Sequence, residues 1–183
     1  MNVEGHLQGM GEHVELLTER LSLRRPTPAD IDAILAVHAD PRAVAHNPSD
    51  GLATRDEAAE LYARWDEHWR CHGFGYWVVR RHGVDEQLGF CGLKYVDERL
   101  LNLFYRFAPD SWGQGIATEA ATAVVRWAAQ LPDHTVIARV RPDNEASQGV
   151  AVRAGLSRAT HLDAEGYDGL DWVFWSGLVP EGG

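Results

Sequence analysis

The sequence predicts a single α/β domain, with a mixed, mostly antiparallel twisted sheet of about seven strands flanked by about four helices. Two observations lead to this fold class. Strand-like and helix-like runs follow one another as strand, two helices, three strands, helix, strand, helix and two strands, so the helices must pack on a one-layer sheet. The 183 residues suffice for one domain with a sizeable core, and no repeat or low-complexity segment divides them.

The first half of the chain begins with a polar, Gly-rich stretch at residues 1–13, which we expect to be a flexible tail before a folded domain at 14–179. Alternating leucines then predict a strand. Helix-start signals follow in two places, a Thr-Pro-Ala-Asp run and a Thr-Arg-Asp-Glu capping box. The predicted elements are a strand at Glu15–Arg25, a helix at Ala29–His38 and a helix from Arg55 to about His72.

The second half opens with three apolar runs separated by short turns, which predict a meander of strands. A helix-like run near the end is closed by Gly155 as a C-cap. The predicted elements are strands at Gly75–Arg81, Leu88–Tyr95 and Arg99–Phe107, a helix at Thr118–Ala129, a strand at Thr135–Val140, a helix at Asn144–Ala154, and strands at Ser157–Leu162 and Asp171–Leu178.

Composition narrows the class of protein. A hydrophobic fraction of 45% and a charged fraction of 24% are those of an ordinary globular protein. The net charge of −10 argues against a nucleic-acid partner, and no run approaches the ~20 apolar residues of a membrane span. Cys71 and Cys91 are expected to be reduced, buried thiols, and the nine histidines show no metal-ligand spacing, so no metal is expected. We therefore expect a cytoplasmic protein without a membrane partner.

The most informative stretch is Ala108–Ala120, which joins a strand-like run to a helix-like run through Gly113 and Gly115. Two glycines in such a turn let the backbone approach a ligand closely, and the N–H groups at a helix start favour phosphate. The stretch has neither the Lys-Ser/Thr ending of a Walker loop nor a Gly-x-Gly-x-x-Gly fingerprint. It is a candidate pyrophosphate cradle, although an ordinary strand-to-helix turn also explains it.

Four segments in order carry a family resemblance that runs from about Glu15 to Leu178. They are Leu17–Arg24, Trp112–Ala120, Asn144–Ser147 together with the Val150, Arg153, Gly155 and Leu156 that follow, and Asp171–Trp175. These segments resemble the GCN5-related N-acetyltransferases (GNAT), and in particular the branch that acetylates the N-termini of ribosomal proteins. In that branch a Trp often begins the acyl-CoA loop, as Trp112 does here.

The resemblance implies that acetyl-CoA is the cosubstrate. In this family the pantetheine arm lies where two parallel strands splay apart, which correspond to Arg99–Phe107 and Thr135–Val140 here. Backbone groups of Tyr105 and Phe107 would pair with its amides. The pyrophosphate would lie on the N–H groups of six consecutive residues, with the Thr118 hydroxyl as a further donor: Gly113, Gln114, Gly115, Ile116, Ala117 and Thr118.

The resemblance also assigns roles around the reacting thioester. Asn144 would bond the pantetheine arm, and Ser147 would lie near the sulfur and donate a proton to the leaving thiolate. A simpler explanation is that Asn144 caps the helix and Ser147 belongs to its first turn. The tyrosine that serves as the acid elsewhere in the family is replaced by Ala151, so that mechanism does not transfer.

The resemblance does not identify a general base in this chain. Where related enzymes often carry a Glu, this chain has Asn102, which cannot take a proton but can hold a water or orient the amine. Other candidates are Asp97, Glu98, Glu119 and His134, of which the first three also have structural explanations in a turn or a helix start. Deprotonation of the amine by bulk water is a further alternative.

An aromatic-rich region is expected to shape the acceptor site. The second helix and the strand after it carry Tyr62, Trp65, Trp69, Phe74, Tyr76 and Trp77, although two Trp at helical spacing more often belong to a core. With Asp66 and Glu67 nearby, such a wall would suit a cationic amine.

These inferences lead to one expected function and two alternatives. We expect an acetyl-CoA-dependent N-acetyltransferase that moves an acetyl group directly, in a ternary complex, to a primary amine of a protein N-terminus or a small molecule. A non-catalytic acyl-CoA-binding sensor or regulatory module is the first alternative, and a nucleotide-binding α/β protein is the second. The last strands also offer a surface for a homodimer.

Overall fold

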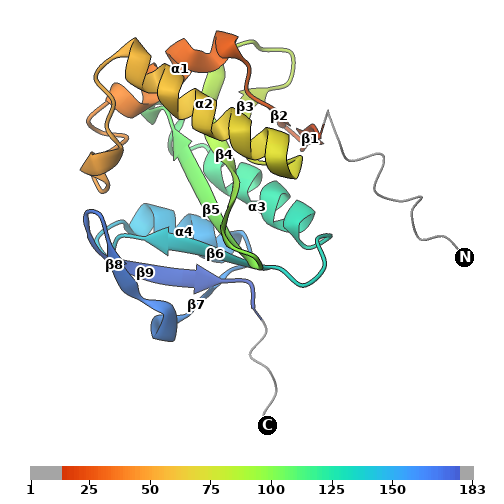
Figure 1. Ribbon diagram of the computed structural model, residues 1–183, viewed down its shortest axis with the longest axis vertical. Helices are drawn as coiled ribbons and strands as arrows, with labels where there is room; N and C mark the ends of the chain where they lie inside the picture. The colour runs from red at the N-terminus through yellow and green to blue at the C-terminus, as the bar shows by residue number, and fades with distance from the viewer. Residues whose placement is uncertain (1–13, 178–183) are drawn as a thin grey trace, which may run out of the picture.

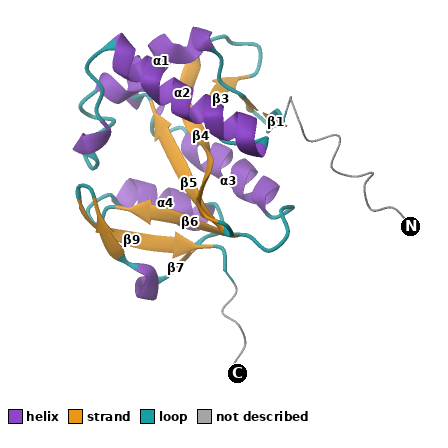
Figure 2. Cartoon of the chain, viewed as in Figure 1, coloured by secondary structure: helices purple, strands orange, loops and turns teal. Residues whose placement is uncertain are grey.

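A twisted nine-stranded sheet forms the centre of the computed structural model, which describes residues 14–177 (Figures 1 and 2). The strands are ordered β1-β2-β3-β4-β5-β6-β9-β7, with β8 paired to β9, and every pair is antiparallel except β5 with β6. Their bounds are β1 Leu16–Leu17, β2 Leu21–Arg24, β3 Tyr76–Arg81, β4 Gln87–Asp97, β5 Leu100–Phe107, β6 Thr135–Val140, β7 Ser157–Arg158, β8 Ala164–Gly166 and β9 Gly169–Trp175. The tail predicted at residues 1–13 lies outside the described residues, as does Leu178 at the end of the predicted last strand, which in the structure ends earlier, at Trp175.

Four α-helices cover the two faces of the sheet, as predicted. They are α1 Ile31–Ala39, α2 Arg55–His72, α3 Ile116–Ala128 and α4 Glu145–Arg153. Ile34 of α1 and Trp65 of α2 pack with Phe90 in one apolar cluster, whereas Val124 of α3 packs with Leu103 in the other. No helix within residues 14–177 is both long enough and apolar enough to cross a membrane.

Local sequence signals place several elements closely. The capping box at α2 is present: Thr54 Oγ1 accepts a hydrogen bond from Glu57 N at 3.2 Å, and Glu57 Oε2 accepts one from Thr54 N at 3.0 Å. Gly73, with φ of 75°, ends the helix by donating to the Trp69 carbonyl. The helix therefore has the predicted bounds, and so does the strand at Thr135–Val140.

Three elements differ most from the prediction, and most of the others have ends that are shifted by one to three residues. The first strand, expected at Glu15–Arg25, is divided into β1 and β2 because Thr18 Oγ1 accepts a hydrogen bond from Leu21 N at 2.9 Å and closes a turn. The strand expected at Ser157–Leu162 ends at Arg158 and continues as a 3₁₀ turn. The predictions omit β8 because its Ala-Glu-Gly sequence has no apolar alternation.

The two cysteines lie in different environments. Cys91 in β4 is buried, as expected, but Cys71 is exposed, so the expectation of a second buried thiol is wrong. Cys71 lies two residues beyond Trp69 in α2, which places it away from the buried side of the helix, and its Sγ lies 3.3 Å from Glu67 Oε1.

A buried carboxylate fixes the start of α1 against the sheet. The Asp30 side chain is 0% exposed, and its oxygens accept hydrogen bonds at 2.8–3.1 Å from Arg24, Arg80, Gln87 and the Thr27 N–H group. Burial opposes ionisation of Asp30, but these hydrogen bonds outweigh it and hold its pKa below the usual value. The cluster ties α1 to strands β2, β3 and β4, and so positions one wall of the site described below.

Two buried histidines make the fold sensitive to acid. His38 Nδ1 lies 2.9 Å from the Ile34 carbonyl and His68 Nδ1 lies 2.8 Å from the Phe74 carbonyl, so each ring donates from Nδ1. Burial, together with the nearby positive charge of Arg106, lowers the pKa of His38 to about 4, and burial lowers the pKa of His68 to about 4. Both rings are therefore neutral in the folded protein at pH 7.

We expect the free energy of unfolding to fall as the pH drops from 7 to 5. In the unfolded chain an imidazole takes up a proton below about pH 6.5, whereas these two stay neutral until about pH 4. Protons therefore favour the unfolded state between those pH values. Each histidine should lower the free energy of unfolding by about 2 kcal/mol at pH 5. Urea unfolding at both pH values should show a smaller loss in His68→Gln than in the unaltered protein. An unchanged loss in that variant would contradict the expectation, and the exposed His82→Gln serves as the control.

Candidate active site

Strands β5 and β6 open a V-shaped gap in the sheet. Their parallel pairing is limited to three residues on each strand, Leu100–Asn102 with Thr135–Ile137. Beyond Asn102 the strands diverge: in Figure 1 they start close together near the centre of the picture, and β5 rises toward the upper left while β6 runs to the left. The edge of β5 that would face β6 is left without a strand partner from residue 103 to 107.

A cleft of about 1100 Å³ lies at this gap. Its lining comes from the loop after α1, from α2, from β4 and β5, and from the starts of α3 and α4. Of the site residues predicted from sequence, it contains Asn102, Tyr105, Phe107, Gly113, Gly115, Ile116, Ala117, Thr118, Asn144 and Ser147. Gln114 is absent from the lining, so the structure gathers all but one of the predicted residues around a single space.

The predicted cradle is a row of N–H groups at the start of α3. Gly113 and Gly115 have φ angles of 74° and 76°, which turn the chain sharply into the helix, and Gly115 is the N-cap residue. Within the described part of the chain, no hydrogen bond uses the N–H groups of residues 113–118. Six consecutive donors at the positive end of a helix form a site for a phosphate group.

One ion pair and several hydrogen bonds hold the backbone of the cradle in place. Arg20 Nη1 donates to the Gln114 carbonyl at 2.9 Å, and Arg20 Nε donates to Glu119 Oε2 at 2.6 Å. The Gln114 side chain bonds Arg81 and the Asp110 carbonyl. The backbone N–H group of Gln114 is thus available to a ligand, while its carbonyl and its side chain are occupied.

Tyr105 and Ser147 meet across the cleft. The Ser147 hydroxyl lies 2.9 Å from Tyr105 Oη, which donates to the Ser147 carbonyl at 2.7 Å. Asn144 caps α4, since its Oδ1 accepts a hydrogen bond from Ser147 N at 3.1 Å. Burial raises the pKa of Tyr105 to about 12, so this phenol keeps its proton at neutral pH. The sequence predicted a backbone role for Tyr105 and missed its hydroxyl.

Asn102 lies on the opposite face of β5 from Tyr105. Alternation along the strand places Asn102, Phe104 and Arg106 on the face covered by α1 and α2. Asn102 Oδ1 is buried and has no hydrogen-bond partner among residues 14–177. A shielded carbonyl oxygen without a donor is costly, so this atom is poised to accept a hydrogen bond from a bound molecule.

The other base candidates lie away from the cleft. Asp97 ends β4 and Glu98 begins the turn to β5, both exposed, and His134 is held by the Tyr95 hydroxyl and the Pro132 carbonyl. Burial opposes ionisation of Glu119, but hydrogen bonds from Thr18 and Arg20 outweigh it and keep its pKa low. Two histidines that sequence reasoning missed, His38 and His46, do line the cleft.

The aromatic wall is divided between site and core. Trp65, Tyr76 and Phe104 line the cleft, and their rings pack at centroid distances of 4.6–6.3 Å. Trp69, Phe74 and Trp77 are buried in the core instead. The expected acidic neighbours, Asp66 and Glu67, are absent from the lining and pair instead with Arg25 and Arg70. The prediction that Asp66 and Glu67 lie beside the aromatic residues of the site is therefore wrong.

Charged residues in the cleft were also missed by the sequence analysis. Arg64 of α2, Lys94 of β4 and Arg106 of β5 all contribute to the lining. Metal ligands are a different matter: over residues 14–177 no three His, Cys, Asp or Glu side chains gather closely enough to hold an ion.

This fold and site define the class of protein. The family model of the acetyltransferase (GNAT) domain matches residues 20–157, about three quarters of the chain. The protein belongs to this acetyltransferase family, as the resemblance predicted, and its α/β fold is the GNAT fold.

Several solved acetyltransferase structures have a fold similar to that of this chain. An acetyltransferase from Agrobacterium tumefaciens str. C58 is 26% identical with a TM-score of 0.75, and the match covers 90% of this chain and 94% of that one. The spermidine N-acetyltransferase from Vibrio cholerae, solved with CoA and spermine, is 18% identical with a TM-score of 0.72, covering 86% and 95%. RimL, a ribosomal L7/L12 alpha-N-protein acetyltransferase solved with coenzyme A, is 16% identical with a TM-score of 0.72, covering 88% and 96%. These equal scores do not single out the ribosomal-protein branch.

Proposed function

We propose that this protein is an acetyl-CoA-dependent N-acetyltransferase that transfers an acetyl group directly to a primary amine in a ternary complex. The observation that carries the proposal is the row of six N–H groups at residues 113–118, which have no hydrogen-bond partner among residues 14–177 and lie at the gap between β5 and β6. The CoA-bound relatives named above support acetyl-CoA as the cosubstrate. A protein N-terminus, as in RimL, or a small amine are both acceptors within this proposal.

Each half of the cosubstrate has a matching part of the site. The pyrophosphate would be held by the N–H groups of Gly113–Thr118, with the Thr118 hydroxyl beside them. The pantetheine amides would extend along the unpaired edge of β5 at Tyr105 and Phe107, as an added strand does. Asn144 lies where this arm would reach α4.

The chemistry requires a neutral amine that attacks the thioester carbonyl, so that a C–N bond forms as the C–S bond breaks. Asn102 Oδ1 would accept a hydrogen bond from the amine and orient it, and Ser147 would donate one to the departing sulfur. A phenol with a pKa of about 12 holds its proton more tightly than a thiol, whose pKa is about 8.5. The Tyr105–Ser147 pair therefore stabilises the thiolate by hydrogen bonding, and the proton that ends on sulfur comes from the attacking amine.

Titration calorimetry with acetyl-CoA, followed by free-thiol release against a panel of amines and N-terminal peptides, tests the proposal. Saturable binding with amine-dependent thiol release and a product heavier by one acetyl group would support it. Binding without release to any acceptor would favour a non-catalytic acyl-CoA-binding module. Absence of binding would overturn the proposal.

Ser147→Ala provides a test of the leaving-group contact. We expect kcat to fall about 10- to 100-fold with little change in the Kd for acetyl-CoA, because the hydroxyl acts when charge develops on sulfur. Tyr105→Phe should show a smaller loss of the same kind. Equal losses in kcat and in acetyl-CoA affinity would instead make Ser147 a binding residue. Steady-state kinetics and calorimetry on the same preparations separate the two outcomes.

A further inference from the structure

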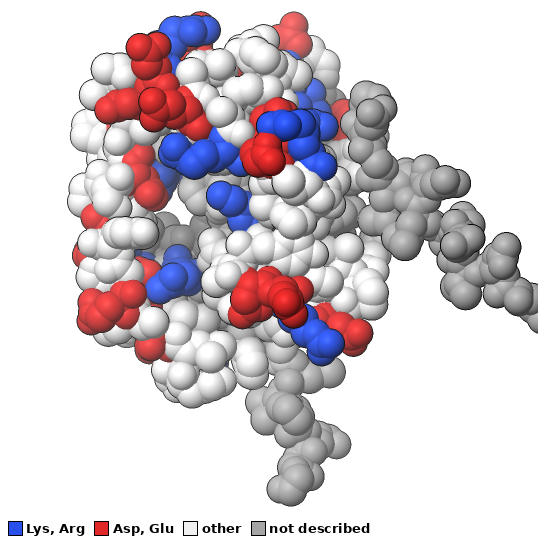
Figure 3. Space-filling model, viewed as in Figure 1, with Lys and Arg blue, Asp and Glu red and all other residues white. Residues whose placement is uncertain are grey.

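The cleft is cationic in a chain that is strongly acidic. Among residues 14–177, six basic side chains line it: Arg42, Arg64, Lys94, Arg106, Arg139 and Arg153. Within the same range the acidic lining residues are Asp50 and Asp171 alone. The whole chain has a net charge of −10. Figure 3 shows Lys and Arg side chains bordering the hollow on this face. Charge of one sign gathered in a cleft attracts a ligand of the other sign.

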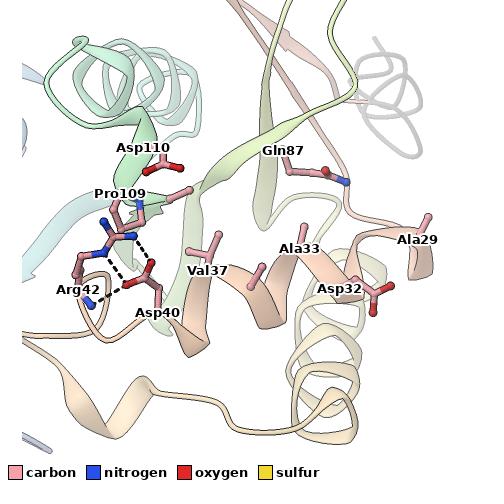
Figure 4. Close-up of a pocket in the computed structure, with 11 residues that line it drawn as sticks. Ala29, Asp32, Ala33, Val37, Asp40, Arg42, Gln87, Pro109 and Asp110 are labelled. Carbon is pink, nitrogen blue, oxygen red and sulfur yellow. Dashed lines mark hydrogen bonds and ion pairs between the residues drawn. The ribbon is translucent and has the colours of Figure 1, made fainter.

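A smaller cavity nearby shows that this charge is local. It measures about 400 Å³ and is lined by three acids, Asp32, Asp40 and Asp110, with Arg42 as its only cation (Figure 4). Arg42 is bound there by Asp40 at 2.8 Å, as the dashed lines in Figure 4 mark. The positive charge of Arg42, which also lines the larger cleft, is therefore neutralised by Asp40.

Most other cations of the cleft are also engaged. Arg106 is 9% exposed and pairs with Asp50 at 2.7 Å, Arg139 pairs with Asp171 at 3.4 Å, and Arg153 donates to the Thr118 hydroxyl beside the cradle. Arg64 and Lys94 are different, because neither has an ion-pair or side-chain hydrogen-bond partner among the residues the structure describes. Lys94 is also the single lysine of the 183-residue sequence.

The two cations line the same cleft as Asn102. Lys94 on β4 is the register partner of Asn102 on β5, and both belong to the face covered by α2, which carries Arg64. Burial and the positive charge of Arg64 together lower the pKa of Lys94. Lys94 is half-buried and Arg64 is exposed, and like charges that line one cleft repel each other unless an anion lies between them. Arg106 Nη1, also shielded and without a partner among residues 14–177, adds a third donor on this face.

We propose that the acceptor amine carries a carboxylate, and that Arg64 and Lys94 bind this carboxylate while Asn102 holds the amine. The inference rests on the proposed function, which it makes more specific. Opposed residues on neighbouring strands have Cβ atoms about 4.5–5.5 Å apart, so the two acceptor groups must be a few bonds apart. An α-amino acid meets this requirement, and Trp65, Tyr76 and Phe104 provide an apolar wall for its side chain. A polyamine would instead place its extra positive charge against these two cations.

Matched acceptors test this inference directly. Leucine, methionine, phenylalanine and tryptophan are each compared with their amides, which lack only the carboxylate, in thiol release from acetyl-CoA. We expect kcat/KM to be about 10- to 100-fold higher for at least one free acid than for its amide, since hydrogen bonds to a charged group carry that much discrimination. The amide is the easier nucleophile, because its ammonium loses a proton more readily, so intrinsic reactivity cannot produce this preference.

Variants that remove a positive charge test whether Lys94 and Arg64 produce the preference for the free acid. Lys94→Gln and Arg64→Gln should each lower kcat/KM for the acid about tenfold or more and so reduce the ratio of acid to amide, with the Kd for acetyl-CoA nearly unchanged. Arg126→Gln removes an equal charge from an exposed position on α3 outside the cleft, and should change none of these values. Thermal melts check that each variant is folded.

Failure of this inference is distinguishable from failure of the proposed function. Faster turnover of amides, polyamines or peptide N-termini than of every free acid would overturn the carboxylate site but leave an active acetyltransferase. An acid preference that survives both Lys94→Gln and Arg64→Gln would overturn the assignment of these residues. Failure to bind acetyl-CoA would overturn the proposed function itself.

Discussion

Replacing Gly115 by glutamate should lower the affinity for acetyl-CoA by at least about 100-fold, because the substitution places a like charge where the pyrophosphate would bind. Gly115 is the N-cap of α3 with φ of 76°, a conformation that residues with a Cβ rarely adopt. A Cβ there would also lie 3.3 Å from Arg20 Nη2, which helps to hold the cradle. The carboxylate of the introduced glutamate would compete with the ligand for the six N–H groups of the cradle.

The chain offers a matched control for the backbone strain. Gly83, in the turn between β3 and β4, has φ of 69° and open space where a Cβ would point, but it lies outside the cleft. Gly83→Glu should therefore match the strain and the added charge while leaving acetyl-CoA binding intact. Titration calorimetry compares the variants after thermal melts confirm folding. Equal affinity in Gly115→Glu and the unaltered protein would move the pyrophosphate site elsewhere.

Asp30→Asn should lower the free energy of unfolding by about 3–5 kcal/mol, the usual cost of leaving buried charges without their partner. Asp30 is fully buried between the Arg24 and Arg80 guanidinium groups, which have 29% and 15% of their side chains exposed. An amide of the same shape cannot neutralise them, and its NH₂ group would face other donors. A loss of this size is a large fraction of the roughly 5–15 kcal/mol that stabilises a typical domain.

Asp32→Asn is the control, because it removes the same charge two residues further along. Asp32 is 79% exposed and pairs with an Arg55 side chain that is 62% exposed, so we expect a change within about 0.5 kcal/mol. Urea unfolding at pH 7 measures both variants. Similar small losses in the two would show that the buried cluster is not important for stability.

The fold was largely predictable because local signals determine it. The capping box at Thr54–Glu57 and the apolar run at Thr135–Val140 gave correct bounds for one helix and one strand, since each depends on neighbouring residues alone. The divided first strand was not predictable from alternation, because its turn is closed by the Thr18 side chain. β8 depends on pairing with β9, a contact that an unpatterned tripeptide does not reveal.

The part of the candidate site that lies in one short sequence motif was predictable from the sequence. The part that tertiary packing brings together was not. The glycines at 113 and 115 mark the cradle within one short stretch. The cationic residues Arg64, Lys94 and Arg106 come from a helix and two strands, and only the sheet register brings them together. Strand alternation could have placed Arg106 on the face of Asn102, but not the Asp50 that pairs with it from the loop after α1.

The single lysine has a practical consequence for work with this protein. Reagents that couple to amines, whether for biosensor immobilisation, fluorescent labelling or reductive methylation, can modify only one side chain, and that side chain lies in the cleft. Attachment through Lys94 would block the site under study, whereas the exposed thiol of Cys71 on α2 lies outside the lining and offers a safer anchor. Conversely, ¹³C-methylation of Lys94 would introduce one side-chain NMR reporter inside the cleft, with the α-amine as the only other labelled position.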